Sequence, residues 1–130
     1  MRAWYPLITT TALRECCEFY QRAFDAHIVF RSEHYVQIAL GDWEIGLVRP
    51  QPPVPLPVFP HTTQTRGLCL VIEVDDVAGA FEMLTRRGIV PLGTLKRFAN
   101  GEDAFTVVDP AGTVLNFVAR NGSGAERLQP

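Results

Sequence analysis

Hydrophobic residues along the chain repeat with two different spacings, and the spacings alternate in blocks. Between residues 10 and 26 apolar side chains recur every three or four positions, which is the spacing of one helix face. The same spacing returns between residues 75 and 88. Each block follows a short apolar run, "WYPLIT" or "LCLVIEV", and precedes three strand-like runs. The pattern therefore predicts the order strand, helix, strand, strand, strand, written twice.

The ends of both predicted helices carry start and stop signals. Thr10 or Thr11 stands where the first helix needs an N-cap, and Asp75 or Asp76 stands there in the second. Gly88 then supplies the stop of the second helix. The strand-like runs after the helices are 27–31, 34–40 and 43–48 in the first half, and 90–98, 103–109 and 113–120 in the second.

The two halves correspond to each other as an internal repeat. A shift of 64 residues carries Tyr5 onto Cys69, and a shift of 70 carries Gly46 onto Asn116. Each copy has only one helix, which can cover only one face of a small sheet. We therefore expect an α+β protein of two βαβββ modules, each with a small mixed sheet, whose two bare sheet faces can pair into one concave surface.

The length and composition fit one domain spanning residues 1–130, because a chain of 130 residues that is 47% hydrophobic can bury a proper core. Within it we expect module one at about 3–50, module two at 67–120 and a tail at 121–130. The proline-rich linker, 50–66, is interpreted as a stiff strap or a lid over the cavity; a ligand for an SH3-like groove is the alternative.

Charge and cysteine usage narrow the choice of partners. The net charge is -2 with acidic and basic residues mixed, which gives no footprint for nucleic acid and no patch for a membrane. Cys16 and Cys17 are adjacent and poorly placed for a mutual disulfide, so a reducing cytoplasm fits best. Neither a signal peptide nor a membrane span is apparent. We expect a cytoplasmic protein that binds a small molecule and a second copy of itself.

Four stretches follow one another in a characteristic order: "EFYQRAF", "YVQIALGDWEIGLVRP", "IEVDDVAGAFEMLTRRGI" and "VVDPAGTVLNFV". From about Tyr5 to Ala119 the chain thereby resembles the vicinal oxygen chelate superfamily, which groups glyoxalase I, bleomycin-resistance proteins, fosfomycin-modifying enzymes and extradiol dioxygenases. The resemblance implies two βαβββ modules side by side, a U-shaped mixed sheet around a ligand cavity and usually a homodimer. It implies no single function, because this fold hosts lyases, isomerases, oxygenases, transferases and pure binders.

Metal-dependent relatives take His, Gln or Glu ligands from the first and last strands of each module. The resemblance maps these four positions onto Tyr5, Gly46, Cys69 and Asn116, and the internal repeat pairs them in the same way. None of the four supplies the imidazole or carboxylate that divalent metals require. The comparison therefore implies a protein without bound metal or other cofactor, similar to the bleomycin-resistance branch.

Strand alternation predicts which side chains line the cavity, because Val36, Ile38, Ile45 and Leu47 must face the helix. The predicted ligand-binding residues are Tyr5, Tyr35, Gln37, Glu44, Gly46, Cys69 and Asn116, with Val48, Val71, Glu73 and Val118 beside them. Glycine at position 46 would leave room for a flat ligand. The three histidines have no ligand spacing and are interpreted as solvated: His27, His34 and His61.

Three hypotheses about function follow. The leading one is a metal-free binding protein for a small, partly aromatic molecule, such as an antibiotic or another secondary metabolite. The second is an enzyme that works without protein-bound metal, with Glu44 or Glu73 as general base and Tyr5 as hydrogen-bond donor. The third is a metal-dependent lyase or dioxygenase whose ligands lie at other positions.

Overall fold

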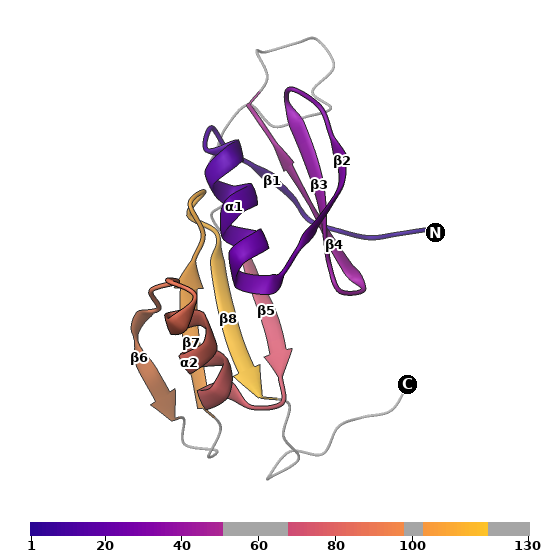
Figure 1. The fold of residues 1–130 in the computed structure, drawn as a ribbon. Coiled ribbons are helices and arrows are strands. Elements are labelled where there is room, and N and C mark those ends of the chain that lie inside the picture. Colours follow the sequence, from indigo (N-terminus) through magenta and orange to yellow (C-terminus); the bar gives the residue numbers. More distant parts are fainter. Residues whose placement is uncertain (51–67, 98–102, 120–130) are drawn as a thin grey trace. The chain divides into compact units, whose positions relative to one another are not determined.

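The computed structural model describes residues 1–50, 68–97 and 103–119 (Figure 1). All the predicted strands and helices are present, although several bounds differ by one to three residues. The helices are α1 (Leu13–Phe24) and α2 (Val77–Arg86), and the strands are β1 (Leu7–Thr9), β2 (His27–Arg31), β3 (Tyr35–Leu40), β4 (Trp43–Val48), β5 (Cys69–Val74), β6 (Leu92–Arg97), β7 (Asp103–Val108) and β8 (Val114–Ala119). Nearly all of the predicted linker, and the tail, lie outside the described residues.

The strands form two four-stranded mixed sheets with the orders β1-β4-β3-β2 and β5-β8-β7-β6. This arrangement confirms the predicted α+β class with two βαβββ modules. The chain divides into two compact units, one of Met1–Leu68 with Asp109–Thr113 and one of Cys69–Val108 with Val114–Pro130. The turn between β7 and β8 thus belongs to the first unit. No helix in the described ranges is long and apolar enough to cross a membrane.

Strand register confirms the internal repeat residue by residue. In the parallel pair β1–β4, Leu7 lies opposite Gly46, and in the parallel pair β5–β8, Val71 lies opposite Asn116. These pairs are related by the two shifts that the sequence predicts, 64 for the first strand of a module and 70 for the last. The two modules therefore share one hydrogen-bonding plan as well as one order of elements.

Each helix covers one face of its sheet (Figure 1). In the first unit the buried side chains on β3, β4 and α1 include Val36, Ile38, Ile45, Leu47, Cys16, Cys17, Phe19 and Tyr20. In the second unit they are Val77, Leu84, Phe105, Val107, Leu115 and Phe117. Phe105 and Phe117 stack with their ring centroids 4.6 Å apart, and Phe81 of α2 meets Phe105 edge-on. The apolar side chains at helical spacing and those at strand spacing thus pack together in one buried layer in each unit.

The start of α1 differs from the prediction. Its N-cap is Ala12, and no side chain caps the helix. The Thr10 hydroxyl instead accepts a hydrogen bond from the Ala12 N–H at 2.9 Å. The prediction of Thr10 or Thr11 as N-cap is therefore wrong, because the Thr10 hydroxyl closes a short turn that precedes the helix.

Both ends of α2 agree with the prediction. Asp76 is the N-cap, and its carboxylate accepts the Gly79 N–H at 3.0 Å. After the helix, Gly88 adopts a φ of 82°, a conformation that side chains disfavour. The chain then turns back so that the Ile89 N–H reaches the Leu84 carbonyl at 2.9 Å. The helix therefore ends in a glycine-dependent turn.

A buried carboxylate, Asp109, joins α1 to the "DPAG" turn inside the first unit. The Tyr20 hydroxyl donates to it at 2.6 Å, and the N–H groups of Ala111 and Thr113 donate at 2.9 and 2.8 Å. Asp109 is only 4% exposed, so these three donors replace most of its hydration. Burial, followed by the charge of Asp109, raises the pKa of Tyr20 well above its usual value and that of Cys16 to about 12.

We predict that Tyr20→Phe lowers the free energy of unfolding by about 2 kcal/mol, because it removes a buried hydrogen bond to a charged group. Urea titration monitored by circular dichroism measures this change. The control is Tyr35→Phe, whose half-buried phenol should contribute less than about 1 kcal/mol.

The Tyr20→Phe variant, compared with wild type, also tests pH dependence. The raised pKa values mean that the stability from Tyr20 and Cys16 is full below their ordinary pKa values and declines as pH rises through the raised ones. Wild-type protein should lose stability above about pH 9, and Tyr20→Phe should lose less over that range. Equal alkaline slopes in both proteins would contradict the role assigned to Tyr20.

Candidate functional site

The face of the first sheet that points away from α1 carries the polar residues that strand alternation predicts there. Tyr35 and Gln37 are half-buried on β3, whereas their neighbours Val36 and Ile38 are fully buried under α1. On β4, Glu44 is half-buried next to them, since Gln37 lies opposite Gly46 and Ala39 lies opposite Glu44. The predicted phase of both strands is therefore correct.

These side chains form one continuous hydrogen-bonded row. The Tyr35 hydroxyl donates to Gln37 Oε1 at 2.7 Å, and Gln37 Nε2 donates to Glu44 Oε1 at 2.5 Å. Tyr5 hydrogen-bonds to Tyr35 at the other end. We call Tyr5, Tyr35, Gln37 and Glu44 the polar row. Both ends of the Gln37 amide are engaged, which holds the side chains of the row in place before any ligand arrives.

Tyr5 occupies a different place from the one predicted. The sequence places it in the first strand, but β1 begins two residues later, at Leu7. Pro6 intervenes and lacks the N–H that a ladder needs. The Pro6 carbonyl nevertheless accepts the Gly46 N–H at 2.9 Å, which keeps this stretch beside β4. Tyr5 therefore joins the polar row from a segment outside the sheet.

The Tyr35 phenol is set up as a neutral hydrogen-bond donor. Partial burial, then the neighbouring Tyr5 and Glu44, raise the pKa of Tyr35 to about 12. The cause is physical: a phenolate here would be poorly hydrated and would lie near a carboxylate. The hydroxyl therefore keeps its proton throughout the physiological pH range.

Gly46 provides the space that Tyr35 occupies. A Cβ atom at this position would lie 2.6 Å from the Tyr35 hydroxyl oxygen and 3.0 Å from Leu7 Cδ1. The sequence suggests that this glycine leaves room for a flat ligand, but the phenol of Tyr35 fills that room. Val48, also predicted on this face, is only 3% exposed. The accessible part of the face is therefore built around Glu44, Gln37 and Tyr35.

Phe30 belongs to the same face and is missed by simple alternation. A β-bulge lies between Ile28 and Phe30, so Phe30 pairs with Gln37 and not with the residue that regular pairing would give it. Its ring is 56% exposed, and its centroid lies 6.2 Å from that of Tyr35. An exposed aromatic pair thus borders the polar row. Three consecutive apolar residues in this strand, "IVF", break the alternation, and this is the sequence signal from which Phe30 could have been found.

In the second unit, three side chains form a separate cluster on the sheet face that points away from α2. Asn116 Nδ2 donates to Cys69 Sγ at 3.0 Å, and the Thr106 hydroxyl donates to Asn116 Oδ1 at 2.7 Å. Thr106 was not among the predicted residues, although it lies directly opposite Asn116 and out of phase with the buried Phe105. Cys69 and Asn116 are thus brought into contact as the repeat suggests, and their role as ligand contacts stays a prediction.

Cys69, Val71 and Glu73 on β5 share one face, as alternation predicts, and all three are exposed, Val71 to 62%. Glu73 and Glu44 lie in different units, and nothing in the structure favours Glu73 over Glu44 as a base. Val118 is half-buried on β8. This face therefore presents an apolar residue between a thiol and a carboxylate.

The donors at the four mapped positions do not match a divalent metal. Tyr5 offers a phenol, Gly46 has no side chain, and the Asn116 oxygen already accepts a hydrogen bond from Thr106. Among the described residues, no group of three or more His, Cys, Asp or Glu side chains could hold a metal ion. His27 and His34 are exposed as expected, and His61 lies outside the described residues. The absence of bound metal stays a prediction.

Two βαβββ units, each with one helix and one sheet face turned away from it, define the glyoxalase class of fold. The model of the Glyoxalase/Bleomycin resistance protein/Dioxygenase superfamily matches residues 5–117, and the chain belongs to this superfamily. None of the curated proteins searched matches the chain.

Solved structures agree with this assignment. A lactoylglutathione lyase from Agrobacterium tumefaciens superposes with a TM-score of 0.72 at 19% identity, covering 92% of this chain and 95% of that chain. A bleomycin resistance determinant encoded on transposon Tn5 gives 0.68 at 19% identity, covering 94% and 100%. A glyoxalase/bleomycin resistance protein/dioxygenase from Nocardioides gives 0.76 at 16% identity, covering 98% and 89%. At these identities the likeness concerns the fold.

We predict that Gly46→Ala destabilises the protein by about 1–3 kcal/mol, because the new methyl group overlaps the Tyr35 hydroxyl. In a Tyr35→Phe background the same substitution should cost less, since the closest atom is then absent. Urea titration of the four proteins gives the coupling as a double-mutant cycle. An identical cost in both backgrounds would show that Tyr35 does not depend on this glycine.

Proposed function

We propose that this protein binds a small, partly aromatic molecule against the first sheet, on the face that carries the polar row, without a protein-bound metal. The observation that carries the proposal is the continuous hydrogen bonding of Tyr35, Gln37 and Glu44. A row of side chains fixed in advance loses little conformational freedom when a ligand binds.

The chemistry of this face suggests which groups the ligand has. Phe30 and Tyr35 offer ring surfaces 6.2 Å apart, which suit an aromatic or flat apolar group. Glu44 accepts from Gln37 through Oε1, so its second oxygen is an acceptor for an amine or amide N–H of the ligand. The preferred ligand is thus an aromatic molecule with a nitrogen donor, a description that many antibiotics and secondary metabolites meet.

The relatives support a binding role without fixing it. One solved relative is described as a bleomycin resistance determinant, whereas another is described as a lactoylglutathione lyase. The mapped ligand positions of this chain lack the imidazole and carboxylate groups of a metal-dependent enzyme. This difference favours the bleomycin-resistance type of function, in which the protein holds a molecule and does not transform it.

An enzyme that works without metal is the second candidate, and one observation favours it. The Gln37 amide positions the Glu44 carboxylate in the same row as Tyr5, so a candidate base and a candidate donor lie in one row. Turnover that is unaffected by chelators would support this candidate. Stoichiometric binding without product formation would support the first.

We predict that a ligand found by thermal-shift screening of antibiotics and metabolites binds about tenfold or more weakly to Glu44→Ala and Gln37→Ala, since each loses a polar contact. The melting temperatures of the free variants should change little, because neither side chain belongs to the core under α1. Glu82→Ala, an exposed substitution on α2, is the matched control. Normal binding by both variants would overturn the proposed site.

The purified protein also tests the proposal that no metal is bound. We expect no stoichiometric zinc, nickel, iron or manganese by elemental analysis and no effect of chelator on melting, because the donor set is too poor to retain one. One equivalent of tightly held metal, whose removal abolishes activity, would instead support the metal-dependent alternative.

We also propose that the protein is a homodimer. Exposed apolar side chains such as Trp43 and Val71, 77% and 62% exposed, lie on both sheets, and pairing between copies would cover them. A stable interface should bury on the order of 1,000 Å² or more. Light scattering at micromolar concentration should therefore give the mass of a dimer, and a monomer under these conditions would contradict the proposal.

A further inference from the structure

A hollow of about 410 Å³ lies in the first unit, beside the first two turns of α1 and thus on the opposite side of the sheet from the polar row. Its floor is apolar and buried, formed by Leu13, Cys17 and Val36, each at most 5% exposed. Its rim includes three arginines: Arg14, Arg31 and Arg49. A volume of this size is typical of a pocket for a small organic molecule.

The three arginines come from three separate elements and converge on one opening. Arg14 is in the first turn of α1, Arg31 ends β2 and Arg49 follows β4. Arg49 is held near the helix start by long hydrogen bonds to the carbonyls of Thr11, at 3.5 Å, and Glu33, at 3.4 Å. Within the described residues no ion pair involves Arg31.

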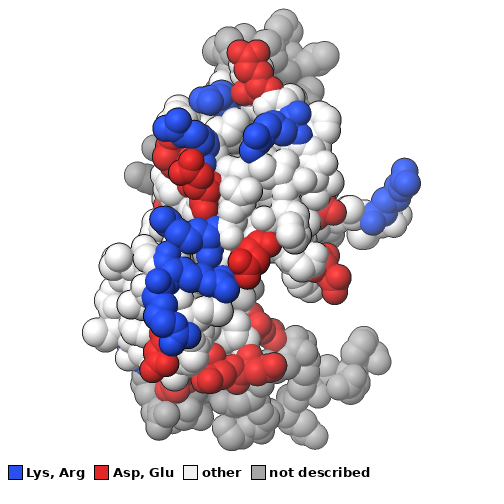
Figure 2. Space-filling view, viewed as in Figure 1, with Lys and Arg blue, Asp and Glu red and all other residues white. Residues whose placement is uncertain are grey.

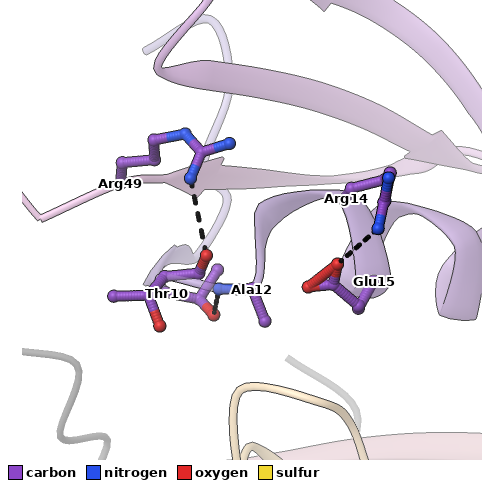
Figure 3. A network of polar contacts seen from close by, with 6 residues as sticks. Thr10, Ala12, Arg14, Glu15 and Arg49 are labelled. Atoms are coloured by element: carbon purple, nitrogen blue, oxygen red, sulfur yellow. Dashed lines mark hydrogen bonds and ion pairs between the residues drawn. The ribbon is translucent and has the colours of Figure 1, made fainter.

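Acidic residues also surround the hollow. Glu18 and Glu33 line it together with the three arginines, and Glu15 lies beside Arg14. Arg14 contacts Glu15 at 3.5 Å (Figure 3), but both side chains are largely exposed, so this ion pair is weak and easily exchanged for another anion. Acidic and basic side chains gather on the face that Figure 2 shows. The charge around the hollow is therefore mixed and balances once Glu15 is counted, but among the described residues Arg31 is left without an ion pair.

The start of α1 adds a second source of positive potential. The helix has 12 residues, and no side chain caps its N-terminus. The first N–H groups of a helix have no partner inside the helix, and the aligned peptide dipoles favour an anion there. Leu13 and Arg14, the first two helical residues, both line the hollow. The N–H groups and the guanidinium groups thus favour the same kind of ligand.

We propose that this hollow is a second ligand site, which binds a small organic anion. The anionic group, a carboxylate or a phosphate, lies between Arg31 and the N-terminus of α1, because guanidinium and helix N–H groups both match its oxygen atoms. The apolar part of the molecule covers Leu13, Cys17 and Val36. An apolar floor distinguishes this site from one for inorganic phosphate.

The test is an NMR titration of the full chain with phenyl phosphate and, separately, benzoate. Both should give saturable shifts of the backbone amides of Leu13, Arg14 and Ser32. Inorganic phosphate should bind more weakly because it has no apolar part, and benzamidine, a cation of similar shape, should leave these amides unshifted. The better of the two anions identifies the preferred head group.

Charge variants test the direction in which anion binding changes. Arg31→Gln should weaken binding of the preferred anion about fivefold, the scale of one exposed charged contact, and Glu18→Gln should strengthen it by a smaller factor. Arg86→Gln, on α2, is the matched control and should have no effect. Because all three side chains are exposed, the variants should melt like the wild type.

Three results would overturn the proposal. The first is the lack of any saturable shift at millimolar concentrations of both anions. The second is a shift confined to Tyr35, Gln37 and Glu44, which would assign the anion to the polar row. The third is equal binding by wild type, Arg31→Gln and Glu18→Gln. The first and third results leave the proposed binding of an aromatic amine at the polar row untouched, whereas the second would also argue against that ligand.

Discussion

Each four-stranded sheet has a single helix to cover it, and this constraint decides where everything else lies. In the first unit α1 removes Val36, Ile38 and Leu47 from water, so the apolar layer forms on that side alone. The opposite face must be satisfied by other means. Its strands carry residues that bond to one another, and Gln37 is engaged at both ends of its amide. The polar row is therefore a consequence of how the helix is placed.

Most of the fold can be predicted from residue spacing, because burial under one helix imposes strict periods of 3.6 and 2 on the sequence. The repeat adds register, since equivalent residues of the two modules occupy equivalent ladder positions, as Leu7 and Val71 do. The N-cap of α1 could not be predicted in this way. Thr10 and Thr11 both suit a cap chemically. Which residue becomes the N-cap depends on the geometry of the turn before the helix, and the spacing of apolar residues carries no information about that turn.

The candidate site could be predicted in part. Alternation identifies Tyr35, Gln37 and Glu44, but it fails at Phe30 because a bulge inserts one residue into β2 and reverses the phase. It also misjudges Gly46. A missing side chain indicates that something comes close to the backbone, and the sequence cannot say whether that is a ligand or the Tyr35 phenol. Only the packed structure distinguishes these two.

Hydrogen bonding within the sheets also underlies the proposal that this protein binds an organic ligand without metal. A metal ligand needs a lone pair directed at the ion, but the oxygens of Gln37 and Asn116 accept bonds from Tyr35 and Thr106. A cation there would have only the second lone pair of each neutral amide oxygen, without the carboxylate or imidazole that a divalent ion requires. An organic ligand would disturb less, because it could contact the ring faces of Phe30 and Tyr35 and the second oxygen of Glu44 while the hydrogen bonds of the polar row stay intact. The same bonds that hold the side chains in place thus restrict which ligands they can serve.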